Sequence, residues 1–208
     1  MQEKKRKIGI LGGTFNPIHY GHLMIGDNAL HQFGLDEVIY MPTGHAPHKQ
    51  FSGDEMAEHR CRMVEAAISD NPDFSISYYE VNTRETSYTY RTLQHFHRKN
   101  PDAELYFLLG ADSLADFSTW RHPELICKEA ILLAAVRDNL TESKVDEQIA
   151  LLQEKFDCTI YRLETPNFNI SGKKLRARVQ EGKSIRYMLP ESVEAYIRKN
   201  RLYLEDET

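Results

Sequence analysis

Short apolar runs alternate with longer amphipathic stretches along this chain. The apolar runs are rich in residues that favour β-structure, and they predict strands at Ile8–Leu11, Val38–Met41, Phe74–Val81, Glu104–Leu109, Ile131–Val136 and Thr159–Leu163. The intervening stretches predict helices, such as Glu55–Ser69, with Arg60 and Arg62 on its polar side, and Glu142–Lys155. This alternation favours the α/β class with a doubly wound parallel sheet.

Several helix ends are predicted by residues with special backbone behaviour. Gly34 and Gly182 are expected to end helices, because glycine tolerates the left-handed conformation that follows a last turn. Ser171 is a good N-cap, and Pro190 suits the first position of a final helix that runs to Lys199.

Composition and charge narrow the class of protein. The 208 residues are 41% hydrophobic and 27% charged, as in a soluble globular enzyme, and we expect one domain over residues 1–208, with a basic tail at 1–6 and a core at 7–204. A net charge of −5 argues against broad nucleic-acid binding. Cys61, Cys127 and Cys158 form neither a disulfide framework nor a zinc pattern, which favours a reducing, cytoplasmic location. No apolar run or leader-like segment suggests a membrane partner.

The stretch Lys7–Ile25 carries the strongest chemical signal. Its strand is expected to stop at Gly12 and Gly13, where the backbone can take a positive φ and a ligand can approach closely. Asn16 and Pro17 are expected to cap and begin a helix. A strand, a glycine turn and a helix N-terminus collect unpaired N–H groups, which suit a phosphate. His19 and His22, three residues apart, would add donors on the same face.

This stretch does not match the commoner phosphate loops. Its glycines do not follow the G-x-G-x-x-G pattern, and the GKS at Gly182 lacks a glycine five residues earlier. Its sequence, GGTFNPIHYGH, resembles the signature of the nucleotidyltransferase superfamily, with H-x-G-H at His19–His22. The alternative is a strand–turn–helix unit whose histidines only cap or pack.

Three later segments add candidate binding residues. The loop at 42–53 contains His48 and Lys49 and has the length and charge of a lid beside a phosphate site. Trp120, the only tryptophan, follows the glycine turn at 110–112 within a polar segment, so it is a binding candidate as well as a packing residue. In the segment 169–178, Lys173, Lys174 and Arg176 stand near a helix start, where cations oppose the dipole unless an anion binds. We expect Arg176 to contact phosphate and Lys174 to be solvated.

From Lys7 to about Leu204 the chain resembles the bacterial nicotinate-nucleotide adenylyltransferases, which make deamido-NAD and pyrophosphate from ATP and nicotinate mononucleotide. The motifs that carry this resemblance occur in the family's order: GGTFNPIHYGH, PTGHAPHK, the stretch His59–Met63, SYT at 87–89, GAD at 110–112, Trp120, ISGKKLR and GKSIRYMLP. The implied fold is the Rossmann-like nucleotidyltransferase fold.

The resemblance also implies a role for each matching residue. It implies that His19, His22 and Arg176 are catalytic and hold the ATP phosphates. It implies further ATP contacts for Gly12, Gly13, Thr14, Phe15, Gly110, Asp112, Ile170 and Ser171. It implies contacts with the acceptor nucleotide for Asn16, His48, Lys49, Ser87, Tyr88, Thr89 and Trp120, the last beside the nicotinate ring.

Two departures from the family pattern leave some contacts open. In the motif ISGKKLR, Gly172 and Lys173 replace the serine and threonine that are usual in the family, so the lysine charge could replace hydroxyl contacts. Arg91 stands where an aspartate is commoner, so no role of that acid is transferred.

The implied reaction is attack of the mononucleotide phosphate on the α-phosphorus of ATP, which needs alignment and charge neutralisation rather than a protein nucleophile. No metal-ligand cluster is predicted, so Mg²⁺ is expected to arrive on the ATP phosphates. Nicotinamide mononucleotide or pantetheine phosphate as acceptor, CTP as donor, a non-catalytic nucleotide sensor, and a homo-oligomeric assembly all remain open.

Overall fold

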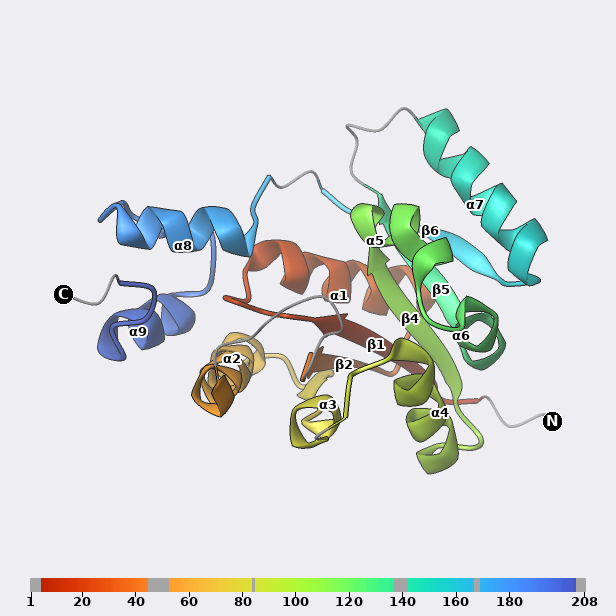
Figure 1. Cartoon of the computed structure of the whole chain (residues 1–208), viewed down its shortest axis with the longest axis horizontal. Helices are drawn as coiled ribbons and strands as arrows, with labels where there is room; N and C mark the ends of the chain where they lie inside the picture. Colours follow the sequence, from red (N-terminus) through yellow and green to blue (C-terminus); the bar gives the residue numbers. More distant parts are fainter. Residues whose placement is uncertain (1–4, 45–52, 84, 137–141, 167–168, 205–208) are drawn as a thin grey trace.

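The computed structural model describes residues 5–44, 53–83, 85–136, 142–166 and 169–204. Within these residues, six parallel strands form one sheet in the order β3-β2-β1-β4-β5-β6 (Figure 1). The strands are β1 (Lys7–Gly13), β2 (Glu37–Pro42), β3 (Phe74–Ile76), β4 (Glu104–Gly110), β5 (Ile131–Val136) and β6 (Ile160–Glu164). The doubly wound parallel sheet predicted from the sequence is confirmed.

Helices cover both faces of this sheet. Side chains of one core come from α1 (Tyr20–Phe33), α2 (Gly53–Ile68), α8 (Gly172–Gln180) and α9 (Glu191–Lys199). The opposite core draws on α4 (Thr89–Lys99), α5 (Ala111–Asp116), α6 (Pro123–Glu129) and α7 (Glu142–Phe156). Two short connections are α3 (Tyr79–Asn82) and the 3₁₀ turn η1 (Phe117–Thr119). In the described part of the chain, no helix has the length and apolarity needed to cross a membrane.

The two cores explain why the strand sequences are apolar almost throughout. In β4, Leu105, Phe107 and Leu109 belong to one core, and Tyr106 and Leu108 belong to the other. Neighbouring side chains of a strand point to opposite faces, so a strand that is covered on both sides needs apolar residues at every position.

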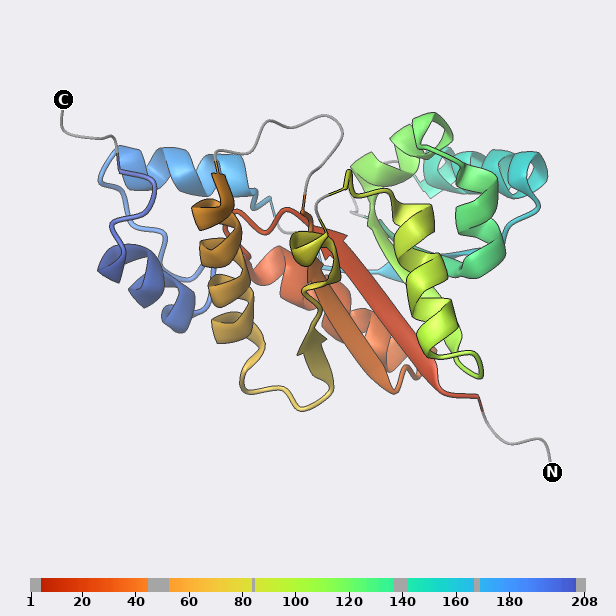
Figure 2. The ribbon, with the colours of Figure 1, turned by 60° about the horizontal axis from the view of Figure 1, so that its bottom comes forward.

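The sheet reverses its winding direction between β1 and β4. Strand β1 pairs with β2 on one side and with β4 on the other, so the chain winds outward from this point in both directions. Helices that leave β1 and β4 therefore diverge to opposite faces and open a crevice at the carboxyl ends of these two strands. Figures 1 and 2 show α8 and α9 at one end of the molecule, with α9 beside α2.

The prediction of a strand at Phe74–Val81 is wrong in its second half. Strand β3 ends at Ile76, and residues 79–82 form the helix α3. Glu80 of α3 is buried and accepts a hydrogen bond from Thr92 Oγ1 at 2.7 Å. Burial raises the pKa of the Glu80 carboxyl above its usual value, with the Thr92 hydrogen bond acting in the opposite direction. The helical turn at residues 79–82 therefore forms where Glu80 contacts Thr92 of α4.

The helix ends predicted at Gly34, Gly182 and Pro190 agree with the structure to within one residue. Gly34 takes the left-handed conformation after α1 with φ 58°, as predicted. Gly182 also takes it, with φ 66°, although the C-cap of α8 is Glu181. Pro190 is the N-cap of α9 rather than its first helical residue, because the helix begins at Glu191.

Arg60 lies in the interior, so its predicted place on the polar side of its helix is wrong. The side chain is 1% exposed, and its guanidinium donates to the carbonyl oxygens of Thr14 and Thr43, each at 2.8 Å. These carbonyls lie just beyond the carboxyl ends of β1 and β2. Burial lowers the pKa of Arg60 from its ordinary value, so the charge is held at a cost in solvation. Arg60 thus connects, through these two hydrogen bonds, the loops that follow β1 and β2.

Replacing Arg60 with methionine should destabilise the fold by about 2–4 kcal/mol, because two buried carbonyls lose their donor. Arg62→Met on the same helix is the matched control, since the Arg62 side chain is 55% exposed and its ion pairs, with Glu58 and Glu65, lie at the surface. Its cost should stay below about 1 kcal/mol. Urea unfolding of both variants measures the difference, and equal destabilisation would contradict this role for Arg60.

Candidate active site

A cavity of about 770 Å³ opens at the carboxyl ends of β1 and β4. Its walls come from the end of β1 and the turn that follows, the first turn of α1, the end of β4 with α5, and the start of α8. Thirteen of the predicted site residues line it: Gly12, Gly13, Thr14, Phe15, Asn16, His19, His22, Gly110, Asp112, Trp120, Ile170, Ser171 and Arg176. The structure therefore brings together residues that are up to 164 positions apart in the sequence, from Gly12 to Arg176 (176 − 12).

The turn after β1 differs from the sequence prediction. Gly12 and Gly13 do not take a positive φ, because they extend β1 and pair with Met41 and Pro42 of β2. Phe15 takes the left-handed conformation instead, with φ 49°. A Cβ on Gly13 would lie 2.8 Å from the Phe15 ring, which is itself buried. Gly13 is needed here for the close packing of Phe15 rather than for an unusual backbone angle.

Helix α1 begins three residues later than predicted. Asn16 and Pro17 are not its cap and first residue, because the N-cap is His19 and the helix starts at Tyr20. The His19 backbone N–H donates to Nδ1 of His22 at 3.3 Å, and the two imidazole rings stack with their centroids 3.8 Å apart. The side chain of His22 thus caps the helix in the manner of a capping box.

This contact also selects the tautomer of His22. Its Nδ1 accepts the backbone hydrogen bond, so the neutral ring carries its proton on Nε2. His22 lines the cavity, and so does His19, which is 5% exposed. The helix N-terminus and two stacked imidazoles therefore form one wall of the cavity.

The start of α8 forms the facing wall. Ser171 caps this helix as predicted, since its hydroxyl accepts from the Lys174 backbone N–H at 3.3 Å. Arg176 Nη1 donates to the Asn16 carbonyl oxygen at 2.7 Å. A Cβ on Gly172 would lie 2.6 Å from that same oxygen. The glycine that departs from the family pattern is therefore the residue that lets α8 approach the turn after β1.

The two lysines of this segment differ in position. Lys173 lines the cavity, whereas Lys174 lies outside its lining and donates through Nζ to Asn169 Oδ1 at 2.7 Å. The expectation that Lys174 is exposed at the surface is confirmed.

Trp120 both packs and lines the cavity. Its ring lies 6.2 Å from that of Phe107 and 5.5 Å from that of Phe117, between ring centroids. Asp112, in the first turn of α5, is the only carboxylate that the described residues contribute to the cavity lining. With two histidines, Lys173, Arg176 and two helix N-termini against one acid, the cavity suits a polyanion.

The segment at residues 87–89, which was predicted to bind the acceptor, lies outside the described cavity lining. Ser87, Tyr88 and Thr89 lie at the start of α4 and are not among the described residues that line the cavity. The Tyr88 ring has the guanidinium groups of Arg91 and Arg121 at 5.7 and 5.9 Å from its centroid, so it packs beside the residue that follows Trp120.

The remaining candidates include two predicted binding residues that the structure does not describe. His48, Lys49 and most of the predicted lid lie outside the described residues. Arg91, where the family has an acid, pairs with Glu85 and donates to Tyr90 Oη at 3.0 Å. No group of three or more potential metal ligands occurs in the ranges that the structure describes.

Two residues that support the site were missed from the sequence. Arg60 lies in register with Met63, Val64 and Ala67, so helical spacing could have placed it on the buried face. Tyr203, near the end of the chain, donates through Oη to Asn16 Oδ1 at 2.5 Å. No sequence pattern links residues 16 and 203, so only the fold reveals this contact.

Comparison with known proteins decides the family. A family model described as Cytidylyltransferase-like matches residues 10–178. A protein of Lachnoclostridium phytofermentans named "Probable nicotinate-nucleotide adenylyltransferase" is 43% identical over 199 residues, which cover 96% of this chain and 100% of that protein. The chain belongs to the nicotinate-nucleotide adenylyltransferase family. A protein of Thermoanaerobacter sp. with the same name is 36% identical over 206 residues, covering 99% of this chain and 98% of its own.

Solved structures show that this family's fold is shared. The Plasmodium falciparum nicotinic acid mononucleotide adenylyltransferase complexed with NaAD has a TM-score of 0.77 and 21% identity over 95% of this chain and 97% of its own. The same enzyme complexed with APC has a TM-score of 0.73 and 22% identity, with the same coverage. The predicted nucleotidyltransferase fold and the family resemblance are both confirmed.

Gly172→Ala should destabilise the protein by about 1–3 kcal/mol, because the new Cβ meets a backbone carbonyl that cannot move aside cheaply. Gly110→Ala is the matched control, since a Cβ there meets nothing within 4 Å. Its effect on unfolding should stay within about 1 kcal/mol. Thermal or urea unfolding compares the two, and equal stabilities would refute the close approach of α8 to the turn.

Proposed function

We propose that this protein transfers AMP from ATP to nicotinate mononucleotide, giving deamido-NAD and pyrophosphate. Its membership of the nicotinate-nucleotide adenylyltransferase family supports this activity. The structural observation that carries the proposal is the pairing of stacked His19 and His22 with Arg176 across one cavity at the switch point of the sheet.

The ATP phosphates are proposed to lie between the N-termini of α1 and α8. His22 would donate from Nε2, and Arg176 from the N–H groups that are not directed at the Asn16 carbonyl. His19 would add a second imidazole donor. Contacts with the rest of the nucleotide are proposed for residues of the remaining cavity wall, namely Gly110, Asp112, Ile170 and Ser171.

The acceptor is proposed to enter beside Trp120. The tryptophan ring is held by Phe107 and Phe117 while it lines the cavity, so it presents a fixed aromatic surface to a pyridine ring. Asn16, His48, Lys49 and the segment Ser87–Thr89 are the proposed polar contacts of the acceptor.

The reaction requires no protein nucleophile. An oxygen of the mononucleotide phosphate attacks the α-phosphorus of ATP, a new P–O bond forms, and the bond to the bridging oxygen of pyrophosphate breaks. Alignment of the two phosphates and neutralisation of the growing negative charge supply the rate acceleration. His19, His22 and Arg176 are the groups placed to do both.

Magnesium fits this site as an ion carried by ATP. The cavity lining described here offers one carboxylate, Asp112, among several cations, which suits an ion that retains phosphate oxygens and waters as its main ligands. When bound, Mg²⁺ would neutralise phosphate charge. We also propose a cytoplasmic location, in keeping with the three free cysteines.

Nicotinate mononucleotide should exceed nicotinamide mononucleotide in kcat/KM by at least about a hundredfold. A carboxylate only accepts hydrogen bonds, whereas the amide brings an NH₂ donor that would face backbone N–H donors, at about 1–3 kcal/mol for each mispaired group. Pyrophosphate release at subsaturating acceptor, with ATP as donor, measures the ratio. Equal rates would indicate dual specificity, and turnover only with CTP or pantetheine phosphate would overturn the proposal.

Lys173→Met should raise the KM for ATP about three- to tenfold, because it removes a cation that lines the proposed phosphate cavity. Lys174→Met removes the same charge from the next position of the same helix turn, where the side chain binds Asn169 instead. Its KM for ATP should change less than about twofold. If the two variants lose ATP affinity equally, Lys173 has no specific contact.

A further inference from the structure

Two oxygen atoms of Asn16, one in the backbone and one in the side chain, accept hydrogen bonds from residues in the last fifth of the chain. Its backbone carbonyl accepts from Arg176 Nη1 at 2.7 Å. Its side-chain Oδ1 accepts from Tyr203 Oη at 2.5 Å, a contact between residues 187 positions apart. Asn16 itself lines the cavity next to the stacked histidines. The C-terminal segment is therefore connected directly to the turn that shapes the proposed phosphate site.

The turn that carries Tyr203 has an unfavourable backbone. Arg201 and Tyr203 both take the left-handed conformation, with φ 50° and 64°. For residues other than glycine, this conformation is unfavourable, so it persists only where other contacts stabilise it.

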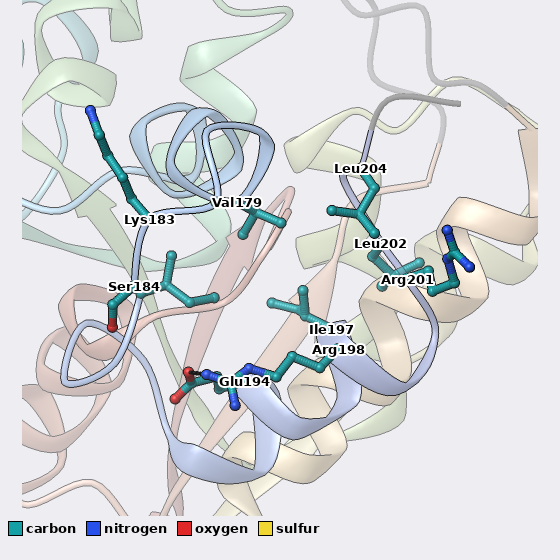
Figure 3. A pocket seen from close by; sticks show the side chains of 11 residues that line it. Val179, Lys183, Ser184, Glu194, Ile197, Arg198, Arg201, Leu202 and Leu204 are labelled. Atoms are coloured by element: carbon teal, nitrogen blue, oxygen red, sulfur yellow. Dashed lines mark hydrogen bonds and ion pairs between the residues drawn. The ribbon is translucent and has the colours of Figure 1, made fainter. Parts of the chain in front are cut away.

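Leu202 provides one of those contacts. It is buried, and its backbone N–H donates to the Ile197 carbonyl at 3.0 Å. Figure 3 shows Leu202 with Ile197 and Leu204 at a second cavity, between α8 and α9. Leu202 thus anchors the turn on α9, and the next residue reaches Asn16 on the other side.

Tyr203 is suited to act as a donor. Burial raises the pKa of its phenol above the ordinary value, although the nearby guanidinium groups of Arg176 and Arg60 oppose the shift. The hydroxyl therefore keeps its proton at neutral pH and donates it to Asn16. Its other hydrogen-bonding neighbour, Met63 Sδ at 3.9 Å, is a weak acceptor.

We propose that Tyr203 is a positioning residue: its phenol holds Asn16, and through it the turn and the Arg176 guanidinium, in the geometry that aligns the reacting phosphates. This inference rests on the proposed adenylyl transfer. Small displacements of aligned groups lower the rate of a transfer reaction more than they lower substrate binding. The contribution of Tyr203 should accordingly appear in kcat rather than in either KM.

Tyr203→Phe keeps the ring and removes only the donor. We expect kcat to fall about five- to thirtyfold, with both KM values within about threefold of wild type. Tyr196→Phe is the matched control, because the Tyr196 hydroxyl makes a comparable 2.9 Å hydrogen bond to His59 Nδ1 from α9, away from the cavity lining. Its kcat should be unchanged. Urea unfolding of both variants verifies that the assayed protein is folded.

The coupling between Tyr203 and Asn16 is tested in two further backgrounds. In Asn16→Asp, an oxygen acceptor for the phenol remains, so adding Tyr203→Phe should lower kcat again by a similar factor. In Asn16→Leu the acceptor is absent, so adding Tyr203→Phe should cost less than twofold. A merely structural tyrosine would give the same factor in both backgrounds.

The outcomes separate this inference from the function on which it rests. A wild-type protein that forms no deamido-NAD from ATP and nicotinate mononucleotide overturns the proposed function. An active wild type with an unaffected Tyr203→Phe variant, or with equal losses in the aspartate and leucine backgrounds, overturns only the positioning role. If Tyr203→Phe does not fold, Tyr203→Leu, which also removes the phenol donor, decides in its place: unchanged kcat there overturns the role, and a kcat loss at constant KM supports it.

Discussion

The buried guanidinium of Arg60 is the contact on which the geometry of this site depends. Loops that leave parallel strands carry carbonyl groups that no longer pair within the sheet, and those of Thr14 and Thr43 lie just beyond the ends of β1 and β2. One arginine donates to both, and in doing so fixes the distance between the turn after β1 and the loop after β2. The cost of burying its charge is offset by two charge-assisted hydrogen bonds.

The turn that Arg60 holds is then shaped by packing against distant segments. Phe15 fits over Gly13 in a left-handed conformation, and α8 approaches so closely that a Cβ at position 172 would lie 2.6 Å from the Asn16 carbonyl oxygen. Arg176 and Tyr203 complete the arrangement from the other side. Four segments separated in sequence thus converge on the turn after β1, and together they form a cradle of hydrogen-bond donors that lines the cavity.

The charges and helix dipoles around the cavity determine which ligands it can bind. Two helix N-termini, stacked imidazoles, Lys173 and Arg176 surround a cavity to which the described residues add one carboxylate. Such an arrangement is unfavourable without a ligand and becomes favourable when phosphates bind, because the cations and dipoles then face negative charge. Under the proposed function, the same groups would stabilise the negative charge that grows in the transition state of phosphoryl transfer.

Local patterns in the sequence determined the strands of the sheet, several helix ends and the pairing of His19 with His22. Runs such as Glu104–Leu109 are apolar because both faces of the sheet are covered, and Ser171 caps its helix through a bond that spans three residues. His19 and His22 lie together because they are the N-cap and the third residue of one helix, joined by a capping-box contact. These features depend on neighbours within a turn or a strand, so the sequence contains them directly.

Tertiary structure alone decided the features that depend on contacts across the chain. The start of α1 lies at His19 rather than at Asn16, and Asn16 is instead held by Arg176 and Tyr203. Residues 79–82 became helical where Glu80 is buried against Thr92. An arginine became buried because two carbonyls needed a donor. Hydrogen bonds between residues 12 to 187 positions apart leave no periodic trace in a sequence, so only the folded chain reveals them.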